Sequence, residues 1–373
     1  MSQTSHAVVA QTFVGDFGQV VSRLRISCPD GDPGLAPADF DIVNGFVNSS
    51  ETLPCQGVRE VHWENGDVVL TVDPFLYRTD FSVRGTGRAE AFSFGKSDVR
   101  AVELQDEELF ESCEENGTLY RLYSPVGDEP RPLILFLHGG GECGSDNTLQ
   151  LTGTLGAIKL AKRFPDMYVM APQAPDGGMT VYEMRSRIQG GGGLVSIDIG
   201  ADTESGKGAR GWNREYLIGV SSCIRRMIRE GKVDERRVYV IGLSMGGAGV
   251  LKELSVAPQL FASAVCICPG MNGETYEILE HLPQVPTYLA TSYIDHQPVR
   301  HAYILRACQA LWERGRTDVR LTVFTKDELR RYRIATAPGL DKGQIQSENH
   351  NSWVLVFHNE YGILDWMVSH VKK

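Results

Sequence analysis

The chain has 373 residues, of which 42% are hydrophobic and 23% charged, the ordinary proportions of a globular protein. Its formal net charge of −10 argues against nucleic acid and against an anionic membrane surface as partners. No apolar run approaches the roughly 18 residues of a membrane span, and the start of the chain lacks the pattern of a signal peptide. Eight cysteines without C-x-x-C spacing indicate reduced thiols, so we expect a cytoplasmic location.

The first 116 residues show little helical periodicity, and a chain of this length predicts a second domain. Short strand-like runs cover residues 8–14, 20–26, 58–63, 68–72 and 81–83. Asn65-Gly66 between two of these runs predicts a β-hairpin. Several short strands at this spacing predict a β-sandwich over residues 1–116, with the acidic stretch 103–115 leading to the boundary.

Strands and helices alternate over residues 117–373, which predicts a mostly parallel sheet with helices on both faces. We expect strands at 119–123, 132–137, 167–170, 237–241, around 266–268, 286–292 and 319–325, and helices at 150–163, 214–230, 303–314 and 361–371. Segments near 176–211 and 326–348 have the character of insertions. The first is polar and glycine-rich, and it is either a lid over the catalytic face or an inert surface loop.

The most informative motif is Gly242-Leu243-Ser244-Met245-Gly246, which fits G-x-S-x-G. An apolar strand precedes it and a helical run follows it, and this is the context that the motif requires. Such a sharp turn exposes the serine hydroxyl above the sheet, and glycines flank it because a Cβ there would collide with the neighbouring elements. The motif predicts Ser244 as a nucleophile. The alternative is a glycine-rich turn with an inert serine.

A serine nucleophile needs a general base, usually a histidine that a carboxylate orients. Asp295 follows the expected strand 286–292, at the sheet edge where sites of α/β proteins form; a helix cap or turn is its alternative role. His350 lies in a polar loop before the last helix, and His358 is the alternative base. We expect Ser244, Asp295 and His350 to converge, and activity to be lost at acid pH as the imidazole protonates.

An oxyanion hole is predicted upstream of these residues. The apolar run 132–137 leads into His138-Gly139-Gly140-Gly141-Glu142, which matches the HGGG-type loop whose backbone N–H groups face a tetrahedral oxyanion. We expect N–H donors at Gly140 or Gly141 and at Met245. A phosphate-binding loop is the alternative, but neither G-x-G-x-x-G nor the P-loop lysine pattern is present.

Three further side chains are expected to line the substrate pocket: Glu142, Trp212 and Trp353. For Trp212, a packing anchor at the start of a helix is an equally good interpretation. Nothing in the pattern requires a metal ion or an organic cofactor.

These motifs, in this order, resemble the polyhydroxybutyrate-depolymerase-like and dienelactone-hydrolase-like carboxylesterases, also called the predicted peptidase group. The resemblance covers roughly residues 117–373 and rests on residues 138–142, 170–175, Trp212, 242–247, Asp295 and 349–353. It implies an α/β-hydrolase fold, with Ser244 as nucleophile, Asp295 as acid and His350 as base. Some relatives carry an N-terminal immunoglobulin-like domain. The chain departs from the family after the acid, where Asp-x-x-Val-Pro is replaced by Asp295-His-Gln-Pro298-Val299.

The resemblance and the motifs together predict a serine carboxylesterase for short-chain acyl or aryl esters. Three alternatives stay open: a peptidase on the same three residues, an esterase for acetyl or feruloyl groups of plant polysaccharide, and a non-catalytic binding module. The expected partner is a small-molecule or carbohydrate-linked ester. The N-terminal sheet is expected to bind carbohydrate, to shape the entrance or to pair with a second copy through its edge.

Overall fold

The computed structural model describes residues 6–44, 57–77, 80–176, 211–295, 298–332 and 349–373. The chain divides into two compact units, Met1–Glu108 and Leu109–Lys373, and each is described by itself. The sequence predicted the boundary near residue 116, directly after the acidic stretch 103–115. In the structure, part of that stretch forms strand β9 (Phe110–Glu115), which pairs antiparallel with β10 (Thr118–Tyr123) of the C-terminal unit.

Two β-sheets form the N-terminal unit, a five-stranded sheet of order β4-β5-β2-β1-β8 and a three-stranded sheet of order β3-β6-β7. Their strands are β1 (Val8–Gly15), β2 (Gly18–Ser27), β3 (Phe40–Asn44), β4 (Val58–Glu64), β5 (Asp67–Leu76), β6 (Phe81–Gly85), β7 (Phe94–Gly95) and β8 (Val99–Leu104). Leu24 of the larger sheet lies in one buried cluster with Phe40 and Phe81 of the smaller sheet. The all-β character predicted for this unit is confirmed, while an immunoglobulin-like topology stays a prediction.

The predicted hairpin at Asn65-Gly66 is present and joins β4 to β5. Asn65 has φ 52° and Gly66 has φ 88°, so both central residues are left-handed, as a type I′ turn requires. Glu64 pairs with Asp67 across the turn. The sequence analysis missed β3, β7, β8 and β9, which are short or carry many exposed polar side chains.

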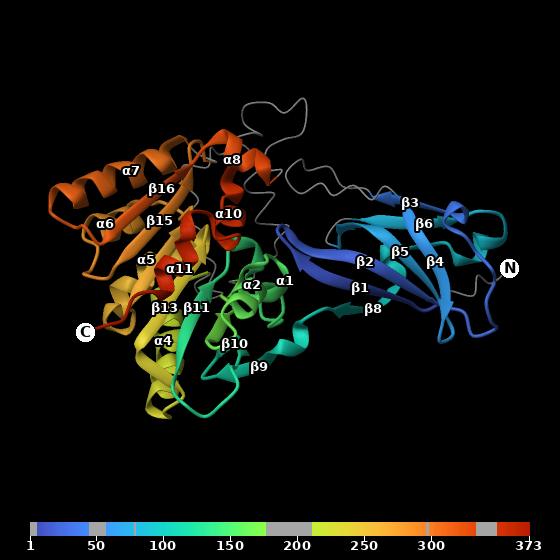
Figure 1. The fold of residues 1–373 in the computed structure, drawn as a ribbon, viewed down its shortest axis with the longest axis horizontal. Coiled ribbons are helices and arrows are strands. Elements are labelled where there is room, and N and C mark those ends of the chain that lie inside the picture. Colours follow the sequence, from blue (N-terminus) through green and yellow to red (C-terminus); the bar gives the residue numbers. More distant parts are fainter. Residues whose placement is uncertain (1–5, 45–56, 78–79, 177–210, 296–297, 333–348) are drawn as a thin grey trace. The chain divides into compact units, whose positions relative to one another are not determined.

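The C-terminal unit is built on an eight-stranded sheet of order β16-β15-β14-β13-β11-β12-β10-β9 (Figure 1). Its central strands are β11 (Arg131–Leu137), β12 (Tyr168–Pro172), β13 (Val233–Leu243), β14 (Ser263–Ile267), β15 (Thr287–Ser292) and β16 (Val319–Phe324). These six run parallel, whereas β10 pairs antiparallel with β12. The parallel strands therefore end at one common edge, where the loops that carry the candidate residues begin.

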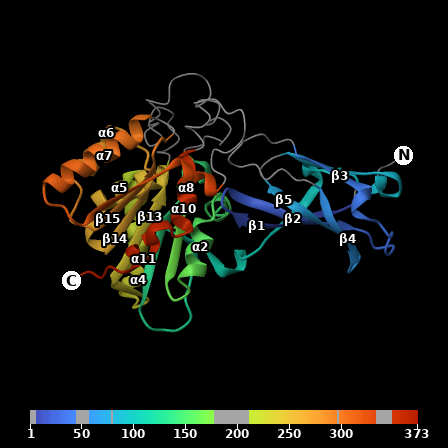
Figure 2. The same cartoon turned by 45° about the horizontal axis from the view of Figure 1, so that its top comes forward.

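Helices cover both faces of this sheet, and Figure 2 shows them in a turned view. They are α1 (Leu149–Thr152), α2 (Gly156–Arg163), α4 (Arg214–Arg229), α5 (Met245–Val256), α6 (Gly273–Glu280), α7 (Pro298–Glu313), α8 (Lys326–Arg331), α10 (Trp353–Phe357) and α11 (Ile363–Val368). Helices α4, α5, α6 and α7 pack in sequence on one face, while α2, α10 and α11 contact each other and the strands on the opposite face. The single helix expected at 150–163 is two helices, interrupted at residues 153–155.

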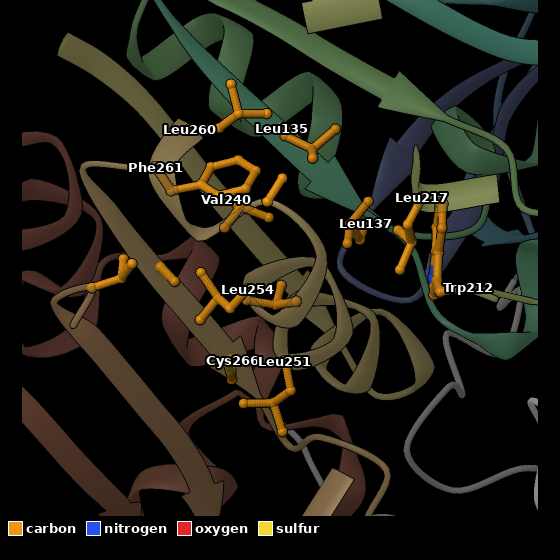
Figure 3. Packing of buried hydrophobic residues seen from close by; sticks show 14 of the residues in the cluster. Leu135, Leu137, Trp212, Leu217, Val240, Leu251, Leu254, Leu260, Phe261 and Cys266 are labelled. Carbon is orange, nitrogen blue, oxygen red and sulfur yellow. The ribbon is translucent and has the colours of Figure 1, made fainter. Parts of the chain in front are cut away.

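The strand β11 shows how the sequence places side chains on both faces. Leu135 and Leu137 belong to the cluster formed with α4 and α5, part of which Figure 3 shows. Phe136 points to the other face, where its ring lies 5.9 Å from that of Phe357 in α10. A strand buried on both faces explains the continuous apolar run at 132–137.

The two predicted insertions fall mostly on residues 177–210 and 333–348, which lie outside the described residues. Helix α8 belongs to the start of the second insertion, and Thr325 and Glu328 cap it reciprocally. No helix in the described parts of the chain combines the length and the apolar character that crossing a membrane needs.

Candidate active site

The G-x-S-x-G motif, residues 242–246, forms a strained turn between β13 and α5, which we call the elbow. Ser244 has φ 55° and ψ −116°, a left-handed backbone conformation that side-chain-bearing residues rarely adopt. A Cβ on Gly242 would lie 2.4 Å from the carbonyl oxygen of Gly246, and one on Gly246 would lie 2.0 Å from that of Leu137. The glycines therefore allow α5 to approach β11 and β13 closely, which holds the serine at the end of the sheet.

The structure brings the three predicted residues together. The Nε2 atom of His350 lies 2.8 Å from Oγ of Ser244, and its Nδ1 atom lies 2.9 Å from Oδ1 of Asp295. Asp295 is fully buried in the loop after β15. The alternative base, His358, is exposed at the end of α10, where its ring packs against Tyr332. The geometry thus selects His350 over His358.

A hydrogen bond between loops positions the imidazole. The hydroxyl of Ser292, the last residue of β15, donates to the carbonyl oxygen of Asn349 at 2.5 Å. The indole of Trp353 meets the His350 ring edge to face, with 5.5 Å between centroids and an interplanar angle of 89°. The His350 imidazole is therefore held on one side by the strand that precedes Asp295 and on another by an aromatic side chain.

The surroundings of His350 set its protonation. Burial, the largest single effect, lowers the pKa of the imidazole. The charge of Asp295, the charge of Cys268 and the hydrogen bond with Asp295 act together in the opposite direction and raise this pKa to about 9. An ionised carboxylate only accepts hydrogen bonds, so Nδ1 carries the proton that is shared with Oδ1 of Asp295. In the neutral ring Nε2 then has a free lone pair, which faces the hydroxyl of Ser244.

Arg300, in the first turn of α7, is a member of this cluster that the sequence analysis missed. Its Nη1 atom lies 3.0 Å from Oδ1 of Asp295 and 2.7 Å from Nδ1 of His350, and its side chain is only 13% exposed. The only signal in the sequence is its place five residues after Asp295. That separation could not be used without knowing that a helix begins between them.

Cys268 also lies beside the pair, past the end of β14, with φ 37°. Its sulfur, one ring nitrogen of His350 and one carboxylate oxygen of Asp295 lie within 4.8 Å of one another. Three such groups form a common metal-binding set, but here a guanidinium already bonds to the carboxylate and contacts the ring. We therefore assign the cluster to acid–base chemistry.

The glycine-rich loop after β11 is anchored by His138. The backbone N–H of Ala174 donates to Nε2 of His138 at 2.9 Å, so the proton of this buried neutral ring is on Nδ1, which donates to the Gly139 carbonyl oxygen at 2.7 Å. Burial lowers the pKa of His138 to about 4, which keeps the ring neutral. Because the Gly139 carbonyl and the Gly140 N–H belong to one planar peptide, fixing the carbonyl also fixes the direction of that N–H.

The glycine-rich loop comes close to Ser244, and Met245 follows Ser244 directly in the chain. A Cβ on Gly139 would lie 3.7 Å from Cβ of Ser244, so the loop reaches the elbow directly. Gly140 and Gly141 form one turn of 3₁₀ helix with the residue that follows, and a Cβ on Gly141 would meet no atom within 4 Å. Met245 is the first residue of α5, so its N–H is among those that have no acceptor within the helix.

The three predicted pocket residues have different surroundings. Trp212 is only 2% exposed, and its indole N–H donates to the His138 carbonyl oxygen at 3.0 Å. We therefore assign it to packing beneath the loop, and not to substrate contact. Glu142 is 9% exposed, with its carboxylate 3.8 Å from Nδ1 of His138, in space that the absent side chain of Gly153 leaves open. Trp353 is half-buried against the base.

Comparisons with known proteins support the fold. No protein-family model matches the chain, and no curated protein matches it. Among solved structures, the chain is similar to a thermostable esterase, with 22% sequence identity and a TM-score of 0.64 over 98% of this chain and 100% of the other. A dienelactone hydrolase from Anabaena variabilis has 15% identity and a TM-score of 0.42, over 71% of this chain and 100% of the other. The likeness to the thermostable esterase shows that the chain has an α/β-hydrolase fold preceded by a smaller β domain, as predicted.

Proposed function

We propose that the protein is a serine carboxylesterase. The observation that carries the proposal is the continuous chain of hydrogen-bonding atoms from Ser244 Oγ through His350 to Asp295 Oδ1, with separations of 2.8 and 2.9 Å. The strained elbow and the glycine-rich loop beside Ser244 support it. The thermostable esterase to which the chain is similar gives further support, since it shares the fold.

In the acylation step, Nε2 of His350 accepts the hydroxyl proton of Ser244 while Oγ attacks the carbonyl carbon of the ester. The imidazolium that forms is stabilised by Asp295. It then gives the proton to the leaving oxygen, so the bond between the acyl carbon and that oxygen breaks, and the alcohol departs. A water molecule repeats the sequence on the acyl-enzyme, passing its proton through His350, and releases the carboxylic acid and free Ser244.

Backbone N–H groups supply the stabilisation of the tetrahedral intermediate in this proposal. The N–H of Gly140, whose direction His138 fixes, and the N–H of Met245 at the start of α5 are the two donors. The positive end of the α5 dipole adds to the stabilisation of negative charge at this place. Removing one such donor typically lowers kcat by roughly 10²–10³.

A labelling experiment tests the nucleophile. A fluorophosphonate probe should modify the wild-type protein on the peptide that contains Ser244, and mass spectrometry locates the label. Ser244→Ala should abolish labelling. Ser255→Ala, at an exposed position on the same helix, is the matched control and should label as the wild type does. Labelling that persists in Ser244→Ala would refute the assignment.

A substrate panel tests the reaction class. We expect hydrolysis of p-nitrophenyl esters with short acyl chains or of aryl esters, and no comparable turnover of aminoacyl p-nitroanilides. If the protein turned over the anilides faster than the esters, it would be a peptidase that acts through the same residues, and the esterase proposal would be wrong. Acetylated and feruloylated polysaccharides belong in the panel, because a carbohydrate-linked ester is the other substrate class that the sequence left open.

A further inference from the structure

Arg300 makes a contact that the proposed reaction does not require. Its Nη1 atom, Oδ1 of Asp295 and Nδ1 of His350 form a triangle with sides of 3.0, 2.7 and 2.9 Å. The Asp295 side of this triangle is an ordinary charge-assisted hydrogen bond between a guanidinium and a carboxylate. The His350 side is different, because it places a permanent cation beside the ring that must accept a proton.

The donors and acceptors of Arg300, His350 and Asp295 limit which hydrogen bonds can form among these three side chains. A guanidinium only donates, so Nη1 bonds to Nδ1 only when that nitrogen carries no proton. When Nδ1 donates to Asp295, the N–H groups of Arg300 and His350 both point at the same carboxylate oxygen. Protonation of Nε2 as well would then place two cations 2.7 Å apart at their nearest nitrogens. Arg300 therefore favours the neutral ring over the imidazolium.

The groups that face the His350 ring give the balance of charge around it. Asp295 in the loop after β15 raises the pKa of the ring, as does Cys268 after β14, while burial and Arg300 of α7 lower it. The hydroxyl of Ser244 on the elbow is neutral. Arg300 is thus the cation among these groups, and it opposes the carboxylate of Asp295, which both Arg300 and the ring contact.

We propose that Arg300 is a positioning residue of the acid–base pair, which holds the Asp295 carboxylate against the ring and at the same time opposes a second proton on His350. The inference rests on the proposed esterase function. Its consequence is a balance between the strength of His350 as a base and the fraction of the enzyme in which the His350 ring is neutral. A weaker base transfers the serine proton less readily, but a larger fraction of the enzyme has the neutral, competent ring at neutral pH.

This balance predicts the behaviour of variants without the charge. In Arg300→Gln the acid limb of the pH profile should move to higher pH by about one pH unit, because the positive charge that opposes the carboxylate is then gone. At a pH below the limb kcat/KM should fall by about tenfold. On the alkaline plateau it should equal or exceed that of the wild type, because the base is stronger. A merely structural role of Arg300 would lower the plateau and leave the limb in place.

The experiment measures two rates against pH, from about pH 6 to about pH 11, which covers an acid limb near pH 9 and its displacement by about one unit. One is kcat/KM for a p-nitrophenyl ester, and the other is the second-order rate of labelling by a fluorophosphonate, which needs no turnover. Arg300→Lys keeps the charge and should keep the limb close to that of the wild type. Arg306→Gln removes the same charge from an exposed position on α7 and should change neither limb nor plateau.

The inference would be overturned if the acid limb of the pH profile did not move in Arg300→Gln or moved to lower pH. It would also be overturned if the limb moved equally in the Lys and Gln variants. If Arg300→Gln does not fold, as judged by circular dichroism, Arg300→Met replaces it and keeps the aliphatic stem. Failure of the proposed function gives a separate result, since the wild-type protein would then not be labelled at Ser244 at any pH.

Discussion

Ser221 of α4 donates a hydrogen bond from its hydroxyl to Oε1 of Glu253 in α5, inside the layer that covers one face of the sheet. Both side chains are fully buried, and among the described residues Oε2 of Glu253 has no hydrogen-bond partner. Burial raises the pKa of this carboxyl from 4.5 to about 7, and the bond from Ser221 lowers it only in part. The helix that follows Ser244 therefore contains a carboxyl that is neutral below about pH 7.

This carboxyl makes stability depend on pH. Between pH 4.5 and about 7 the folded protein keeps a proton on Glu253 that the unfolded chain has lost, so the free energy of unfolding falls as pH rises through this window. The loss reaches about 3 kcal/mol above the window. Glu253→Gln should remove this dependence and raise the stability at pH 8 relative to the wild type.

Urea unfolding at several pH values checks the prediction, with Glu235→Gln as the control at an exposed position. The control should follow the wild type at every pH. If Glu253→Gln and the wild type show parallel pH dependence, the carboxyl is not the titrating group.

The second prediction concerns the base. His350 has a pKa raised to about 9 because the charge and hydrogen bond of Asp295, together with Cys268, exceed the opposing effect of burial, and only the neutral ring accepts the serine proton. We therefore expect kcat/KM to increase with pH, with a midpoint above the ordinary imidazole pKa of about 6.5. Asp295→Asn should move the midpoint down and lower kcat by roughly 10⁴. A wild-type midpoint at or below 6.5 would contradict the arrangement around His350.

The sequence predicted the main elements of the C-terminal unit because its signals are local. A strand buried on both faces leaves a continuous apolar run, and an elbow between β13 and α5 needs glycines at fixed positions. Ser244, Asp295 and His350 could be proposed from their places after strands, and the structure brings them together. The G-x-S-x-G motif alone could not establish that the three residues meet, because their meeting depends on the order of the strands in the sheet.

The interactions that the sequence did not indicate depend on side chains from separate elements. Arg300 contacts both Asp295 and His350 only because α7 begins directly after the acid loop. Trp212 was expected either to line the pocket or to act as a packing anchor, and its indole hydrogen bond and burial favour packing beneath the glycine-rich loop. Strand β9 was not predicted because its exposed side chains are mostly acidic, a composition that also suits a linker.

The third prediction concerns His138 as the anchor of the glycine-rich loop. His138→Phe keeps a ring against Trp212 but removes the bonds to Ala174 and Gly139. The peptide that carries the Gly140 N–H then loses its fixed direction. We expect kcat to fall by roughly 10²-fold while KM changes little, since the donor acts in the transition state. Steady-state kinetics separate the two constants, and a rise in KM at constant kcat would contradict this role.

The last prediction tests the close packing of the elbow. A Cβ on Gly246 would lie 2.0 Å from the carbonyl oxygen of Leu137 and 2.5 Å from that of His138, and both are backbone atoms of a central strand and its loop. Neither can move without displacing the glycine-rich loop, so Gly246→Ala should destabilise the protein by about 3 kcal/mol, the upper range for overpacking. Gly273→Ala, at the start of α6, is the matched control, because a Cβ there meets no atom within 4 Å. Thermal unfolding compares the two variants, and equal stability would show that the elbow tolerates a side chain at this position.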